Sequence, residues 1–268
     1  MKRLLLAFQF LTIIPVKVKG DISGKEISQS ATFFPVVGAF QGLLVVCAAS
    51  ALIRLFPSEI ISGLIILILI ISNGGFHLDG LADTFDALSV KSSGNEAIDR
   101  EKRLSVMKDS FTGAIGVTAI VLAILLKFLL INNLFLKSSI LTTLSLLFLM
   151  PVFSKWAMIP AMYHGTSARQ DGLGKIFLDN IRGDTVIFSS FLVILFYILI
   201  ANINHLSFYR LILFFITLFV VLYIFSFLSV KFCTRKFSGL TGDTLGAISE
   251  ISEIIFLMAV SVWLQHSI

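Results

Sequence analysis

Long apolar runs separated by short polar stretches dominate the chain. A helix needs about 20 apolar residues to cross a bilayer, and seven runs come close to that length. They cover roughly 32–53, 58–75, 112–131, 138–161, 185–203, 208–230 and 245–264. Strand-like alternation is rare, which favours helices over a barrel. The pattern predicts an all-α, polytopic membrane helix bundle that forms a single domain over 1–268.

A shorter apolar stretch, Leu4–Val16, follows the basic N-terminus. Its 13 residues are too few to span. No small-x-small cleavage site follows it, and the lysines that come directly after Pro15 do not fit a signal peptide. We expect an interfacial or re-entrant helix there. Gly38 and Gly42, in the first predicted span, have the spacing of small residues at helix contacts. They indicate packing within the chain rather than dimerisation.

Composition agrees with a lipid environment. The chain is 57% hydrophobic and only 14% charged, whereas soluble domains are about 25% charged. This indicates an integral membrane protein, with the lipid bilayer as a partner and no nucleic acid partner expected. Cys47 and Cys233 lie in separate apolar segments and are interpreted as packing residues. The sequence leaves open whether the chain forms a homo-oligomer.

Basic residues are distributed unequally across the predicted loops. Sixteen of the 21 lie before the first span or in the loops after spans two, four and six. The other side is assigned only Arg54, Lys127, Lys137 and Arg210. By the positive-inside rule, the N-terminus is cytoplasmic and the C-terminus outside. Only Glu59 of the acidic residues falls outside, so any chemistry is expected at the cytoplasmic face of the cell membrane.

The stretch NGGFHLDGLADTFD carries the strongest candidate chemistry. Asp79, Asp83 and Asp86 are spaced i, i+4, i+7 and therefore share one helix face. Three uncompensated carboxylates repel one another, and a hard divalent cation such as Mg²⁺ or Mn²⁺ would relieve that repulsion. A solvated acidic helix end is the alternative reading. His77 could act as a ligand, a base or a hydrogen-bonding partner of an aspartate.

Basic groups could complement these carboxylates. Lys108, beside Asp109 at the start of the third span, could bind phosphate; an interfacial lysine with Asp109 or Ser110 as helix N-cap is the plainer reading. Arg169 lies in the glycine-punctuated loop ARQDGLG, which is also typical of a turn. Lys155, inside the fourth span, either snorkels or lines a polar cavity.

Acidic residues also enter the last span. Asp243, Glu250 and Glu253 are spaced i, i+7, i+10 and lie on one helix face. Carboxylates inside a membrane are costly and commonly functional, although a salt bridge to Lys155 or Lys108 would explain them structurally. Together, these groups suit either Mg²⁺-assisted transfer of a phosphate-linked group or a cation-coupled transporter. The residues alone do not separate the two.

Five ordered motifs resemble those of the cobalamin synthase family, also called adenosylcobinamide-GDP ribazoletransferase. They are FPVVGAFQG, GGFHLDGLADTFD, MKDS-x-x-G, ARQDGLG and GLTGDTLGAISEISE, and they cover nearly the whole chain. The resemblance implies a Mg²⁺-dependent membrane enzyme of late vitamin B12 assembly. It would join adenosylcobinamide-GDP to α-ribazole or α-ribazole 5′-phosphate and release GMP.

The resemblance also implies roles for individual residues. Asp79, Asp83 and Asp86 would hold Mg²⁺, with Asp83, Asp86 and His77 in the catalytic set. Lys108 would stabilise charge on the departing GMP. The residues expected to bind substrate are Asp109, Lys155, Arg169, Asp243, Glu250 and Glu253.

Three positions depart from the family pattern. Ile13 and Phe111 stand where relatives usually have arginine, and Ala87 replaces a glycine. If those arginines bind phosphate, this chain must use other groups such as Lys102, Arg103 or Arg169. The rival readings are a CDP-alcohol phosphotransferase, whose longer motif is incomplete here, and a divalent-cation transporter, which would need more carboxylates on the outer side.

Overall fold

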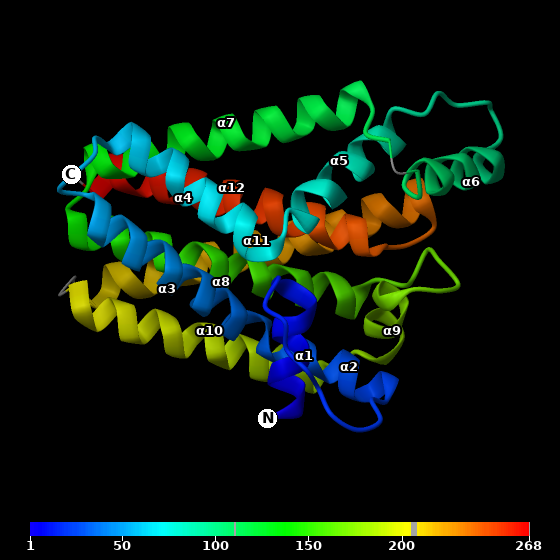
Figure 1. The fold of residues 1–268 in the computed structure, drawn as a ribbon, viewed down its shortest axis with the longest axis horizontal. Coiled ribbons are helices and arrows are strands. Elements are labelled where there is room, and N and C mark those ends of the chain that lie inside the picture. The colour runs from blue at the N-terminus through cyan, green and yellow to red at the C-terminus, as the bar shows by residue number, and fades with distance from the viewer. Residues whose placement is uncertain (110, 205–207, 268) are drawn as a thin grey trace.

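The computed structural model describes residues 1–109, 111–204 and 208–267. Within these ranges the chain is a bundle of helices with one isolated β-bridge and no sheet (Figure 1). The elements are α1 (Lys2–Leu11), α2 (Gly24–Ser30), η1 (Ala31–Phe33), α3 (Phe34–Leu52), α4 (Ser58–Asn73), α5 (Phe76–Leu88), α6 (Glu96–Val106), α7 (Ala114–Lys137), α8 (Ile140–His164), α9 (Leu173–Asn180), α10 (Gly183–Asn204), α11 (Phe208–Phe237) and α12 (Gly242–Ser267).

Six segments of the described chain are long and apolar enough to cross a membrane: 24–52, 114–137, 140–164, 183–201, 212–237 and 242–265. They match six of the seven predicted spans, with boundaries that differ by up to eight residues. The second predicted span, 58–75, differs. Its helix α4 ends at Asn73, and α5 follows at an angle of 89°. If the two form one broken span, they are the seventh crossing; if they form a re-entrant segment, the described chain crosses six times.

The sharp bend between α4 and α5 depends on Gly74 and Gly75. Their φ angles are 67° and 76°, in the left-handed region that favours glycine. A Cβ at Gly74 would also lie 2.6 Å from the Ile13 side chain. Because this pair turns the chain, α5 leaves the direction of α4 and packs between α7 and α12.

Helix α8 forms the centre of the bundle and contacts α3, α10, α11 and α12. Gly38 and Gly42 allow α3 to approach it closely, because a Cβ at either glycine would lie 2.4 Å from the carbonyl oxygen of Pro151 or Phe148. The packing role predicted for these glycines is confirmed. Large apolar side chains such as Leu122 on α7 remain exposed on the outer helices, as expected for a lipid-facing surface.

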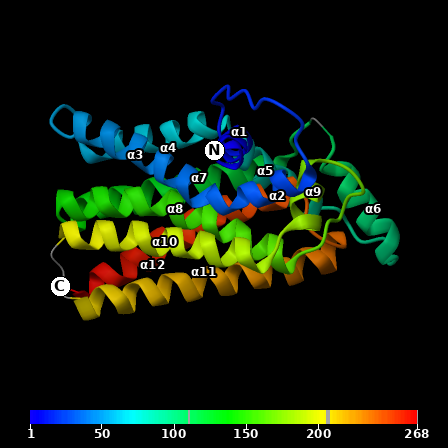
Figure 2. The same ribbon diagram turned by 90° about the horizontal axis from the view of Figure 1, so that it is seen from below.

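The predicted short N-terminal helix is present as α1. It runs across the long helices rather than along them (Figures 1 and 2). Aromatic contacts hold it: Phe8 lies 5.3 Å from Phe40, and Phe10 lies 5.8 Å from Phe34, between ring centroids. α1 therefore lies across the bundle, beside the N-terminal end of α3.

The two ends of the bundle differ in character. The short helices α6 and α9 lie at one end, and the C-terminus lies at the other (Figure 1). Lys127 does not belong to the far end, where the sequence placed it. It is buried in the middle of α7, because that helix continues through Asn132 and Asn133 to Lys137.

Candidate active site

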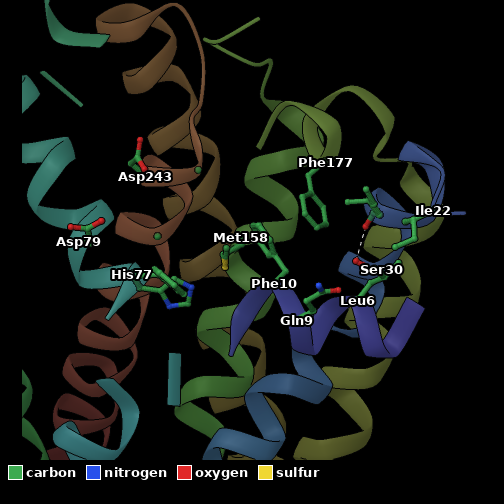
Figure 3. A pocket seen from close by; sticks show the side chains of 14 residues that line it. Leu6, Gln9, Phe10, Ile22, Ser30, His77, Asp79, Met158, Phe177 and Asp243 are labelled. Atoms are coloured by element: carbon green, nitrogen blue, oxygen red, sulfur yellow. Dashed lines mark hydrogen bonds between the residues drawn. The ribbon is translucent and has the colours of Figure 1, made fainter. Parts of the chain in front are cut away.

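A cavity of about 560 Å³ opens between α5 and α12 on one side and α1, α2 and α9 on the other. One wall is polar, and Figure 3 shows His77, Asp79 and Asp243 along it. The opposite wall carries Phe10, Phe177, Leu6 and Ile22. The remaining lining residues are Gln9, Ile27, Ser30, Phe76, Met158, Gly242 and Gly246. The cavity thus brings the acidic motif of α5 and the start of α12 opposite the N-terminal segment.

Close packing of α5 on α12 positions the polar wall. A Cβ at Gly80 would lie 2.7 Å from the Asp243 carbonyl oxygen, and one at Gly246 would lie 3.2 Å from the His77 Cα. Small residues at both positions therefore let the helix backbones approach. This contact places Asp79 and Asp83 of α5 beside Asp243 of α12.

Backbone pairing joins two motifs that are far apart in sequence. Ser167 and Leu240 form a parallel bridge in which the Leu240 N–H donates to Thr166 and the Ala168 N–H donates to Leu240, both at 2.8 Å. The pairing brings Arg169 to Asp243, with 2.9 Å between Nη2 and Oδ2. Arg169 also donates to the Met107 carbonyl oxygen at 3.4 Å, so the MKDS segment reaches the same place.

Asp79 and Asp83 differ from Asp243 in their partners. Among the described residues, no side chain forms a hydrogen bond or ion pair with either carboxylate. Asp83 instead experiences repulsion from Asp79, Asp243 and Asp86, offset in part by Arg169. The exposed Asp79 and the partly buried Asp83 thus leave negative charge without a direct counter-charge beside Asp243.

Carboxylate oxygens are suitable ligands for Mg²⁺, but these side chains alone do not complete its coordination. In the described part of the chain, no three His, Cys, Asp or Glu side chains are close enough to hold an ion together. Mg²⁺ is commonly bound by one or two carboxylates plus substrate phosphates. Asp79 and Asp83 therefore fit a Mg²⁺ ion that arrives with, or is completed by, a phosphate-bearing substrate.

Asp86, the third predicted metal ligand, contacts backbone N–H groups at the start of α7 instead. Its carboxylate accepts backbone hydrogen bonds from Gly113 at 2.6 Å and Gly116 at 2.8 Å. It thereby caps the N-terminus of α7, where a negative charge also complements the helix dipole. The N-cap predicted at Asp109 is wrong, since α7 starts after Gly113; Ser110 lies outside the described residues. A metal role for Asp86 stays a prediction, and these two bonds weigh against it.

His77 contacts Lys155 rather than an aspartate. Its Nδ1 atom lies 3.3 Å from Lys155 Nζ and 3.4 Å from Asn73 Nδ2. Both neighbours are donors in this arrangement, so Nδ1 is an acceptor and the proton resides on Nε2. The imidazole is 6% exposed and lines the cavity. His77 is thus a neutral imidazole with an Nε2–H donor, and Lys155 and Asn73 fix its orientation through Nδ1.

A buried ionic network continues from Lys155 into the bundle. Lys155 Nζ lies 3.4 Å from Glu253 and 2.9 Å from the Ser249 hydroxyl, so this predicted salt bridge is confirmed. Lys127 lies 2.5 Å from both Glu250 and Glu253. The two lysines and two glutamates balance in charge. Lys155 does not snorkel, and the structure places both glutamates in this network, away from the cavity lining.

The remaining predicted residues lie at the surface, next to Met107, whose carbonyl oxygen Arg169 contacts. Lys108 and Asp109 are exposed, and the Asp109 carboxylate accepts a hydrogen bond from the Phe111 N–H at 3.2 Å. Phe111, one of the positions that depart from the family pattern, is 86% exposed. Of the alternative phosphate-binding groups, Arg169 is at the site, whereas Arg103 donates to the Lys236 carbonyl oxygen at 3.2 Å.

Sequence reasoning missed two features of this region. Lys127 was counted with the outer side, although it lies inside the predicted span 112–131 and α7 buries it. The aromatic wall was not anticipated, because Phe10 and Phe177 look like ordinary apolar residues of separate segments. Their ring centroids lie only 4.5 Å apart.

Known proteins of one family are similar to this chain along almost its whole length. The family model described as "Cobalamin-5-phosphate synthase" matches residues 3–261. The adenosylcobinamide-GDP ribazoletransferase of Thermodesulfovibrio yellowstonii is 39% identical, covering 98% of this chain and 99% of the relative. Proteins of the same name from Fusobacterium nucleatum and Geotalea daltonii are 33% and 32% identical, over 96% and 94% of both chains. No solved structure matches. This chain belongs to the cobalamin-5-phosphate synthase family.

Proposed function

We propose that this protein is a membrane-embedded transferase that joins adenosylcobinamide-GDP to α-ribazole or α-ribazole 5′-phosphate and releases GMP. Membership of the family and the names of its relatives support this reaction. They also argue against the two rival readings, a CDP-alcohol phosphotransferase and a cation transporter. The observation that carries the proposal is the cluster of Asp79, Asp83, Asp243 and Arg169 beside a cavity of about 560 Å³.

The reaction requires one P–O bond to form and one to break. A ribazole hydroxyl oxygen attacks the phosphorus attached to the cobinamide arm, and the bond to the bridging oxygen of the diphosphate breaks. GMP leaves with that oxygen, and the hydroxyl proton is released. Positioning and charge stabilisation account for most catalysis of this type.

Each polar group of the site has a task in that scheme. Asp79 and Asp83 would hold Mg²⁺ against the diphosphate, and the ion would offset charge on the phosphate oxygens and the leaving group. Arg169, fixed by Asp243, would bind a phosphate oxygen. Lys108, exposed next to Met107, would stabilise the departing GMP. His77 Nε2–H would donate a hydrogen bond to a substrate oxygen, because Nδ1 is already occupied by Lys155 and Asn73.

A GMP-release assay tests the proposal directly. The purified protein in nanodiscs is given adenosylcobinamide-GDP and α-ribazole, with and without Mg²⁺. We expect GMP only when both substrates and the metal are present. Release without α-ribazole would indicate a hydrolase, and no release from folded protein would contradict the proposed transfer. Metal-independent release would remove Mg²⁺ from the scheme.

The proposal includes an orientation in the cytoplasmic membrane. The N-terminus and the active site would face the cytoplasm, and the C-terminus would lie outside. The unequal distribution of basic residues supports this orientation, and it becomes stronger once Lys127 is counted as buried rather than external.

A further inference from the structure

We propose that the apolar wall of the cavity is the binding subsite for the planar base of the acceptor nucleoside. This inference rests on the proposed function and adds to it a place for one substrate. The wall lies opposite the carboxylates (Figure 3), so a nucleoside bound there would extend its sugar toward the polar side. That orientation is the one needed for a ribose hydroxyl to reach the diphosphate.

Cavity size favours the smaller substrate. Pockets for drug-sized ligands measure about 300–1,000 Å³, and this one measures about 560 Å³. A fused bicyclic base with one pentose fits that range. Adenosylcobinamide-GDP carries a whole corrin ring with an adenosyl group and is far too large to be enclosed here. It can enter only by its diphosphate end, at the polar wall.

The chemistry of the wall matches an apolar planar base. Leu6, Phe10, Ile22, Ile27 and Phe177 provide hydrocarbon and aromatic surface. Phe10 is partly exposed, and its ring centroid lies 4.5 Å from that of Phe177, which is 1% exposed. Aromatic rings of this kind pair favourably with planar bases. The benzimidazole of α-ribazole is mostly hydrocarbon and suits this surface.

Guanine, the other planar base in the reaction, suits it poorly. The edge of guanine presents several donors and acceptors, and burying them against an apolar wall without partners is costly. Two polar side chains line this part of the cavity, Gln9 and Ser30. The Ser30 hydroxyl already donates to the Ile27 carbonyl oxygen at 2.6 Å. Few hydrogen-bonding groups thus remain for guanine at this wall, Gln9 among them, so the wall favours the less polar acceptor base.

Two substitutions test the subsite. Phe10→Leu keeps the residue apolar but removes the ring, and Ile22→Asn places a polar group on a partly exposed position of the loop before α2, where folding should tolerate it. The half-saturating concentration of each substrate is measured by GMP release. We expect both variants to raise the value for α-ribazole by at least about fivefold and to leave that for adenosylcobinamide-GDP within about twofold.

Phe8→Leu is the matched control. It makes the same change on the same helix, but the Phe8 ring packs on Phe40 and does not line the cavity. Thermal unfolding of each variant shows whether it is folded. Both half-saturating concentrations should stay at the wild-type values in the control.

Three outcomes separate the subsite from the function. If Phe10→Leu and Ile22→Asn affect adenosylcobinamide-GDP instead, or neither substrate, the subsite is overturned while the reaction stands. If the wild-type protein releases no GMP, the proposed function fails. In that case, equilibrium dialysis with labelled α-ribazole still decides the subsite: binding that is weakened in both variants but not in Phe8→Leu supports it, and equal binding in all four proteins contradicts it.

Discussion

Three aspartates with regular helical spacing have different surroundings in this protein. Asp79 and Asp83 lie beside Asp243 of α12 and have no direct counter-charge among the described residues. Asp86, one turn further along α5, meets the N-terminus of α7 and accepts two backbone hydrogen bonds. Helical periodicity determined that the three side chains share a face. The neighbouring helix at each position determines what each carboxylate can do.

Asp83→Asn should abolish GMP release without unfolding the protein. The change removes a charge that we assign to Mg²⁺ binding, while the shape of the side chain is almost unchanged. Turnover is measured alongside thermal unfolding in detergent. Normal activity in this variant would contradict the metal role, and a lowered unfolding temperature would indicate a structural role instead.

Asp86→Ala should lower stability while leaving the Mg²⁺ dependence of the remaining activity unchanged. Loss of a helix N-cap costs about 1 kcal/mol. The readouts are thermal unfolding and the Mg²⁺ concentration that gives half-maximal activity. An increase in that concentration comparable to the effect of Asp79→Asn would make Asp86 a metal ligand.

Gly116→Ala provides an independent check on the Asp86 contact. A Cβ at Gly116 would lie 2.3 Å from the Asp86 Oδ2 atom and should disturb the same contact. The closest clash is with the carboxylate, and of the nearest contacts only the 2.9 Å approach to the Ala82 carbonyl oxygen remains without it. The substitution should therefore cost less stability in the Asp86→Ala background than in the wild type. Equal losses in the two backgrounds would show that the two positions act independently.

At the scale of helices, α5 is the element that brings the acidic motif against α12 and so forms the site. The Gly74–Gly75 turn directs it away from α4, and Gly80 and Gly246 let it pack tightly against α12. The sequence predicted a continuous second span through residue 75, because apolar composition does not reveal a bend. The two consecutive glycines were the signal, since both adopt positive φ.

The ionic network between α7, α8 and α12 should contribute strongly to stability. Lys127→Met would leave Glu250 and part of Glu253 buried without their main counter-charge. Removing one partner of a buried ion pair costs about 3–5 kcal/mol, so we expect a large decrease in the midpoint of thermal unfolding in detergent.

Lys137→Met is the control for this prediction. Lys137 is at the exposed end of the same helix, where substitutions usually change stability by no more than about 0.5 kcal/mol. The double variant Lys127→Met/Glu250→Gln should recover part of the loss. Equal unfolding midpoints for the Lys127 and Lys137 variants would contradict the role of the network.

At the scale of the whole molecule, the fold gathers distant motifs at one end of the bundle. The α5 aspartates, the Met107 carbonyl, Arg169 and Asp243 come from segments separated by up to about 160 residues in the sequence. The Thr166–Leu240 backbone pairing and the α5–α12 contact join them. The far end of the bundle, toward the C-terminus, carries few charges.

Reporter fusions test the orientation that this asymmetry implies. A green fluorescent protein fused to the N-terminus should fluoresce in the cytoplasm, and alkaline phosphatase fused to the C-terminus should be active outside. This result requires an odd number of crossings, so α4 and α5 must count together as one span. Phosphatase that is inactive at the C-terminus would mean six crossings and would make α4–α5 re-entrant.

The sequence by itself determined the class of molecule: helices long enough to cross lipid, their approximate boundaries, the family and the identity of most polar residues at the site. These follow from composition, periodicity and short motifs, which are local properties of the chain. Only the tertiary structure decided which polar groups meet. It separated Asp86 from Asp79 and Asp83, paired Lys127 with two glutamates, and placed Phe10 and Phe177 opposite the carboxylates. Such contacts depend on helix directions and close approaches between distant segments, and no local pattern specifies them.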